Sequence, residues 1–283
     1  MKKNTIFVSI DNNFYTLLLE FLRVIKKNYK DHPLIHIIYI NLTEKQKSKA
    51  FFVNKNIKFI ENSITESLIW PIMLHLNSSK YDSIVFYARF MIWNEYFRKF
   101  DKVLHLDVDM LILGPLDYIF KKDDFFIVED IYEWHDFINI NDKNLKKLFK
   151  QDNISKTPKC ANAWMFLVTK KYLTNKVFKE FIEIKNNYKN FIRFADQSII
   201  NIFLHKNNIK ISNDYKSNFQ YRLFFMKYND KKLFNNIKIL HLNWITKNYK
   251  LLFMKILKYS ILFKIWIFIN KASKWKISKY FFN

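Results

Sequence analysis

Glycine is nearly absent from this chain of 283 residues, which contains only Gly114. A dinucleotide-binding fingerprint needs three glycines, because its backbone turns tightly and approaches a pyrophosphate, and a phosphate-binding P-loop needs two. The sequence therefore excludes both of these glycine-loop modes of nucleotide binding.

The composition is that of a folded protein from a reducing compartment. Half of the residues are hydrophobic and 19% are aromatic, which is ample for a buried core at this length. The single cysteine, Cys160, excludes an intramolecular disulfide and any zinc site with several cysteines. The apolar run at 5–10 is interrupted by Asp11 and is too short for a signal peptide. We therefore expect a cytoplasmic protein.

Positive charge is concentrated at the C-terminal end. The formal net charge is +23, and residues 231–283 contain twelve lysines and no acidic residue. Aromatic and aliphatic residues lie between these lysines, as in helices that lie in a membrane interface. No window reaches the roughly 18 uncharged apolar residues of a membrane span. The pattern predicts a basic amphipathic helical tail at 249–283 that binds an anionic membrane surface, peripherally, on the inner face of the cytoplasmic membrane.

Two other interpretations compete with the membrane tail. One is a C-terminal helix that packs on the core with its lysines in solvent. The other is a nucleic-acid-binding protein, which charge and aromatic content alone support, since no recognisable nucleic-acid motif is present. We rank the membrane first and expect no nucleic acid partner.

Strands and helices alternate along the first part of the chain. We expect short buried strands at 4–10, 34–40, 57–60, 102–106, 125–128, 164–168 and 237–240. We expect helices at 14–25, 43–54, 83–100, 170–186 and 196–204. The initial βαβαβ order argues for a parallel sheet with crossover helices. The simplest partition is one α/β catalytic domain, residues 1–248, followed by the tail at 249–283.

The sharpest local feature is a pair of acids, Asp107 and Asp109, directly after a buried strand. In extended backbone, residues i and i+2 point to the same side, so both carboxylates can converge where ligands bind in open α/β sheets. Two carboxylates at one point are best explained by a hard divalent cation such as Mn²⁺ or Mg²⁺ that also binds phosphate oxygens. The alternative is a polar loop at a strand end, because this two-residue pattern is common.

Two histidines are candidates for a third ligand. His105 shares the face of Asp107, but we interpret it as a histidine satisfied within its strand. His241 ends the last predicted strand and is better placed. Lys247 follows six residues later, where an ammonium group would bind phosphate.

Six segments, in order along residues 4–250, resemble glycosyltransferase family 8, the retaining galactosyl- and glucosyltransferases of bacterial lipopolysaccharide and lipooligosaccharide assembly. They are Asp11-Asn12-Asn13-Phe14, Tyr87-Ala88-Arg89, Lys102 to Asp109, Ala161-Asn162-Ala163-Trp164, Ala195-Asp196-Gln197 and His241 to Lys247. Any one segment is weak, but six in order are specific. The resemblance implies a GT-A fold, with a mixed, mostly parallel sheet flanked by helices.

The resemblance also implies a reaction and the residues that perform it. A hexose, galactose or glucose, would pass from a UDP-sugar donor to a glycan or glycolipid acceptor such as lipopolysaccharide core, with retention at the anomeric carbon. Gln197 would be either a weak nucleophile or a dipole that stabilises an oxocarbenium-like state. The resemblance implies that Asp11 and Asn13 contact the uridine and that Lys247 contacts the diphosphate. Around the donor sugar it places Arg89, Asn162, Asp196 and Gln197, of which Asp196 and Gln197 would be catalytic. The implied ligands of Mn²⁺ or Mg²⁺ are Asp107, Asp109 and His241.

The chain departs from the family at two glycine positions, where it has Trp164 and Trp244. Glycine lets backbone approach a ligand closely, so an indole that points inward would narrow or reshape the donor pocket. Ser198 also stands where many members have a second acid. These departures keep a different interpretation open, in which the protein is a catalytically silent member that acts as a binding or assembly partner at the membrane.

Overall fold

The computed structural model describes residues 3–61, 88–130, 142–154, 159–192, 195–212, 220–222 and 238–241. The expected tail, its boundary at residue 248, and the candidates Trp244 and Lys247 lie outside these ranges. Within them, none of the helices combines the length and the apolar character that crossing a membrane requires.

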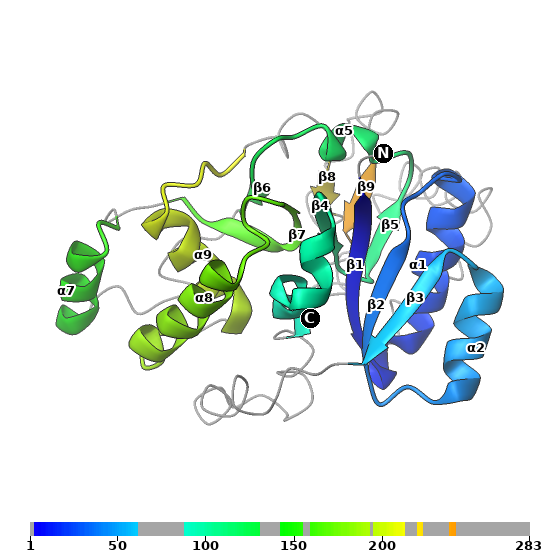
Figure 1. Cartoon of the computed structure of the whole chain (residues 1–283), viewed down its shortest axis with the longest axis horizontal. Helices are drawn as coiled ribbons and strands as arrows, with labels where there is room; N and C mark the ends of the chain where they lie inside the picture. The colour runs from blue at the N-terminus through cyan, green and yellow to red at the C-terminus, as the bar shows by residue number, and fades with distance from the viewer. Residues whose placement is uncertain are drawn as a thin grey trace, which may run out of the picture.

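A six-stranded sheet forms the centre of the molecule, in the order β3-β2-β1-β4-β7-β6 (Figure 1). Its strands are β1 (Asn4–Asp11), β2 (Ile35–Ile40), β3 (Ile57–Glu61), β4 (Lys102–Leu106), β6 (Phe126–Glu129) and β7 (Ala161–Thr169). β1, β2, β3 and β4 run parallel to one another, whereas β7 is antiparallel to both β4 and β6. The predicted mixed, mostly parallel α/β sheet is confirmed.

A second sheet, of three short strands in the order β5-β9-β8, continues from the end of β4. Its strands are β5 (Met110–Ile112), β8 (Gln220–Arg222) and β9 (Ile239–His241). The antiparallel pairing of β5 with β9 places Met110 opposite His241. This pairing brings the last described strand to the carboxyl end of β4.

Helices cover both faces of the main sheet. They are α1 (Tyr15–Asn28), α2 (Glu44–Val53), α5 (Asp117–Phe120), α7 (Lys143–Gln151), α8 (Asn175–Tyr188) and α9 (Ala195–Lys206), with the 3-10 helices η1 (Asn12–Phe14), η2 (Arg89–Trp93) and η3 (Glu95–Lys99). In Figure 1, α1 and α2 lie beside β1 to β3, and α8 and α9 lie beside β6 and β7. Successive residues of a strand enter opposite core layers: Ile6 and Val8 pack in the layer of α1, and Phe7 packs in the layer of α8 and α9.

Two predicted helices differ from those in the structure. From residue 88 onward, η2 and η3 replace the helix expected at 83–100, because Asn94 between them is extended and its Oδ1 accepts a hydrogen bond from the N–H of Tyr96. Asparagine favours such a cap over a helix interior. The helix expected at 170–186 begins later, as α8, because Thr174 caps it by accepting from the N–H of Val177.

Asparagines occupy left-handed backbone positions that glycine usually fills. Asn41, Asn153 and Asn208 have φ between 52° and 57°. Asn208 follows α9, and the N–H of Ile209 then donates to the carbonyl of Leu204 at 2.8 Å, which closes the helix as a Schellman motif. Because asparagine tolerates this conformation better than other residues with a β-carbon, a chain nearly without glycine still ends its helices this way.

The Asn208→Ala variant is expected to lose about 1 kcal/mol of unfolding free energy, because alanine is strained in left-handed backbone. Asn208→Gly is expected to be at least as stable as the parent, since glycine adopts this conformation without strain. The side chain is exposed, so neither variant removes packing. Urea denaturation of the three proteins measures the difference. Equal stability of the two variants would contradict the explanation.

Gly114 has no such role. Its φ is not positive, and a Cβ added there would lie 2.9 Å from Cδ of Lys238. The lysine side chain is flexible and can move aside. Neither backbone conformation nor a rigid neighbour therefore requires the one glycine of this chain.

Candidate active site

The carboxyl end of β4 holds three potential metal ligands. Asp107 follows β4, Asp109 precedes β5, and His241 ends β9. One ligand atom of each residue lies within 4.8 Å of the other two, and His241 Nε2 lies 3.0 Å from Asp109 Oδ1. The structure thus brings together the three residues that were predicted to bind a metal ion.

The backbone reaches this arrangement through a turn. Residues 108 and 109 lie in the turn, and the N–H of Met110 donates to the carbonyl of Asp107 at 3.3 Å. The N–H of Asp107 still extends the main sheet, donating to the carbonyl of Trp164 at 3.0 Å. The expectation of extended backbone through both acids was therefore wrong, although the carboxylates do converge.

The donor set fits a divalent cation. Carboxylates are the preferred ligands of Mg²⁺ and Mn²⁺, and an imidazole is a good ligand of transition metals. The side chains of Asp107 and Asp109 are 27% and 16% exposed, so a phosphate ligand can approach from solvent. His241 is buried beneath them. A cation here would also relieve the repulsion between the two carboxylates.

His105 supports this cluster from inside the sheet. It is fully buried, and its Nε2 lies 3.1 Å from Asp107 Oδ1. Burial lowers the pKa of His105 to about 4, so the imidazole is neutral near pH 7 and donates its Nε2–H to the carboxylate. His105 therefore orients Asp107, as a second-layer histidine commonly orients a metal ligand.

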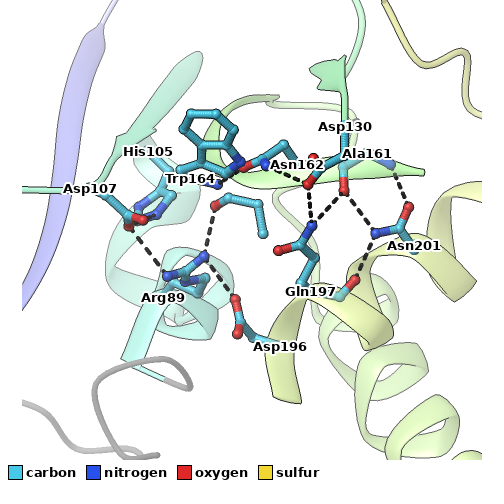
Figure 2. A network of polar contacts seen from close by, with 11 residues as sticks. Arg89, His105, Asp107, Asp130, Ala161, Asn162, Trp164, Asp196, Gln197 and Asn201 are labelled. Atoms are coloured by element: carbon cyan, nitrogen blue, oxygen red, sulfur yellow. Dashed lines mark hydrogen bonds and ion pairs between the residues drawn. The ribbon is translucent and has the colours of Figure 1, made fainter. Parts of the chain in front are cut away.

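Arg89 connects Asp107 to the first turn of α9 (Figure 2). Its buried guanidinium donates through Nη1 to the carbonyl of Ala163 at 2.7 Å. Nη1 also lies 2.8 Å from Asp196 Oδ2, and Nη2 lies 3.3 Å from Asp107 Oδ1. The planar, rigid guanidinium suits such a set of contacts. Arg89 thereby fixes β4, β7 and α9 relative to one another.

Asp196 is buried beside this guanidinium. Burial raises the pKa of Asp196 to about 6, because desolvation of the carboxylate outweighs the attraction of Arg89, and the charge of Asp107 adds to the rise. The carboxyl group therefore takes up a proton at a pH where an exposed aspartate stays ionised.

The Asp196 carboxyl is expected to make the protein less stable as the pH rises through 6. Its pKa in the folded state, about 6, exceeds the ordinary value of 3.8, so the folded chain binds this proton more tightly than the unfolded chain does. The contribution is complete below pH 3.8 and is lost as the pH passes 6. Without added metal, urea denaturation should show the parent gaining stability relative to Asp196→Asn between pH 7 and pH 4. A difference that stays constant with pH would contradict this.

Asp130 anchors two of the predicted sugar-site residues, and the sequence analysis missed it. It follows β6, and its Oδ2 accepts from Asn162 Nδ2 at 2.5 Å and from Gln197 Nε2 at 2.8 Å. Gln197 Nε2 also donates to the carbonyl of Ala161 at 3.2 Å, so the amide oxygen of Gln197 faces away from Asp130, on the Arg89 side (Figure 2). The available signal was an acid just after a predicted strand, the position that Asp107 also occupies.

The loop predicted to hold uridine lies at the carboxyl end of β1, at the same edge of the sheet as Asp107. Asp11 is buried, and its Oδ1 accepts from the backbone N–H groups of Asn13 at 2.9 Å and Phe14 at 3.2 Å. Asn13 is exposed. Asp11 therefore shapes the loop, and the Asn13 side chain is accessible to a ligand.

Trp164, where the resemblance led us to expect glycine, lies against His241, one of the three potential metal ligands. Its indole packs against the His241 imidazole in a tilted arrangement, with the ring centroids 3.8 Å apart and the planes at 37°. The residue is 7% exposed. The Trp164 side chain therefore packs against one of the potential metal ligands.

A sequence comparison with protein families identifies the family of this chain. The model of the glycosyl transferase family 8 matches residues 5–250. A comparison with curated proteins gave no match.

Solved structures share the fold at low sequence identity. The galactosyltransferase LgtC, solved with donor and acceptor sugar analogs, has 19% identity and a TM-score of 0.61, over 84% of this chain and 86% of that chain. Mouse xyloside xylosyltransferase 1 has 11% identity and a TM-score of 0.56, over 85% and 98% of the two chains. GlyE of Streptococcus pneumoniae has 15% identity and a TM-score of 0.55, over 96% of this chain and 64% of that chain.

Since the family model matches most of this chain, the chain belongs to glycosyltransferase family 8 and is a glycosyltransferase.

Proposed function

We propose that this enzyme is a metal-dependent retaining hexosyltransferase, which moves galactose or glucose from a UDP-sugar to a bacterial surface glycan such as lipopolysaccharide core. The observation that carries the proposal is the convergence of Asp107, Asp109 and His241 beside the Arg89–Asp196 ion pair in a family 8 chain. LgtC, which has the same fold, is a galactosyltransferase, and this supports a hexose donor.

The three converging side chains would hold Mn²⁺ or Mg²⁺. A cation bound there supplies a Lewis acid that offsets negative charge on the departing diphosphate. Arg89 and His105 keep the Asp107 carboxylate directed toward that position through contacts of 3.3 Å and 3.1 Å. We assign Lys247 to the same diphosphate, and Asp11 with Asn13 to the uridine.

Gln197 and Asp196 are the proposed catalytic residues at the sugar, with Asn162 as a further contact. The amide nitrogen of Gln197 is committed to Asp130 and Ala161. Its oxygen is thus the atom available to the anomeric carbon, either as a weak nucleophile or as a dipole that stabilises positive charge.

The proposal is tested by mass-spectrometric assay of UDP-hexose hydrolysis across a panel of UDP-sugars, together with calorimetric titration of UDP. We expect hydrolysis of at least one UDP-hexose with Mn²⁺ present and none after chelation. An absence of UDP binding in the presence of the metal would contradict the proposal and favour a catalytically silent binding partner.

We also propose that residues 249–283 bind the inner face of the cytoplasmic membrane, as a segment separate from the catalytic domain at 1–248. The full chain should float with anionic liposomes and a chain ending at residue 248 should not, because each lysine near an anionic surface contributes about 1 kcal/mol. Raising the salt concentration should reduce flotation, and zwitterionic liposomes are the control. Equal flotation of the two chains would remove this proposal.

A further inference from the structure

Trp164 makes two contacts with the group of potential metal ligands formed by Asp107, Asp109 and His241. Its indole packs against the imidazole of His241 at a centroid distance of 3.8 Å, with the ring planes tilted by 37°, and its carbonyl accepts the N–H of Asp107 at 3.0 Å. Its own N–H donates to Asn162 Oδ1 at 3.1 Å, which fixes the backbone of β7 at this point. Trp164 thus contacts two of the three potential metal ligands, and only the contact with His241 uses its side chain.

The histidine needs such support because its strand is short. β9 has three residues and is joined to the rest of the described structure through pairing with β5 and β8. The buried ring of His241 directs Nε2 toward Asp109 Oδ1 at 3.0 Å. An indole packed against that ring restricts the rotation of the imidazole, whereas glycine at this position would leave an indole-sized space beside it.

We propose that Trp164 is a positioning residue that holds His241 ready for the divalent cation, so that its indole is a rigid support for a ligand. The inference rests on the proposed metal-binding function. Residues that orient a metal-ligating histidine typically change metal affinity by about 10-fold to 100-fold when they are removed.

The test is the affinity for Mn²⁺ alone, measured from the electron paramagnetic resonance signal of the unbound ion, with no sugar nucleotide present. Trp164→Gly is expected to weaken Mn²⁺ binding about 10-fold, and Trp164→Phe, which keeps a stacking ring, to stay within about threefold of the parent. In the His241→Ala background, Trp164→Gly should cause no further loss. A full additional loss there, or unchanged affinity in Trp164→Gly, would overturn the inference.

Trp93→Phe is the matched control. Trp93 is also buried, but it packs on Phe166 and Phe181 in the core layer of α8 and α9. Its replacement should lower stability and leave Mn²⁺ affinity unchanged. An equal loss of affinity in this control would show that Trp164 acts only through general packing and would overturn the proposed role. Failure of the parent protein to bind Mn²⁺ would instead contradict the metal-dependent function itself.

Discussion

The Asp109→Asn variant is expected to lose about 10³-fold in kcat/KM for UDP-hexose hydrolysis with Mn²⁺ present. Asparagine keeps the size of the side chain but removes the charge that a hard divalent cation requires. Loss of the Lewis-acid contribution of a metal costs about 4 kcal/mol of transition-state stabilisation, which corresponds to that factor. Steady-state assays over a range of Mn²⁺ concentrations measure the loss and show whether excess metal restores activity.

Asp31→Asn is the control for this change. Asp31 is exposed in the turn between α1 and β2, at the opposite edge of the sheet from Asp109, so the same change in charge there should leave hydrolysis unaltered. Activity of Asp109→Asn within a factor of two of the parent would contradict the assignment of Asp109 as a metal ligand.

The Arg89→Met variant is expected to lose about 3–5 kcal/mol of unfolding free energy. Methionine retains much of the apolar stem but leaves the buried Asp196 carboxylate without its ion pair and removes a contact of Asp107. Breaking a buried ion pair from one side has this cost because the carboxyl left behind must either stay charged in a desolvated site or take up a proton. Urea denaturation at pH 7, without metal or nucleotide, measures the loss independently of catalysis.

Two further variants test the cause of that loss. Adding Asp196→Asn to Arg89→Met should recover part of the stability, because the buried titratable carboxyl is then gone. Arg23→Met removes an exposed ion pair with Glu20, and its cost should stay below about 1 kcal/mol. If Arg89→Met cost no more than Arg23→Met, the buried network would have no structural importance.

The fold could largely be predicted because its strands are strongly apolar and short. β1, β2 and β3 alternate with the helices α1 and α2, and this order alone indicates a parallel sheet. The region after residue 88 was harder, since apolar spacing there suits a helix and a single asparagine cap divides it. The reversal of β7 between β4 and β6 depends on long-range pairing that local periodicity does not record.

The group of potential metal ligands was also partly predictable from the sequence. Both acids were identified from their place after a buried strand, but their convergence through a turn depends on backbone geometry that spacing does not give. The sequence analysis missed Asp130 because the pairing of β6 with β7 shifts register between residues 127 and 129. Alternation along β6 therefore does not tell which side of the sheet the next residue faces. The roles of Lys247 and the tail stay predictions.

The pairing of β9 with β5 also has a consequence for how this enzyme matures. Asp109 and His241 meet in space but are 132 positions apart in the chain. Such a contact closes a long loop, whose entropic cost is met only after much of the intervening chain has organised. A polypeptide still being synthesised, with residue 241 not yet released from the ribosome, carries both acids but not the imidazole. Binding of the proposed cation through all three residues would therefore follow the synthesis and folding of the segment that carries His241.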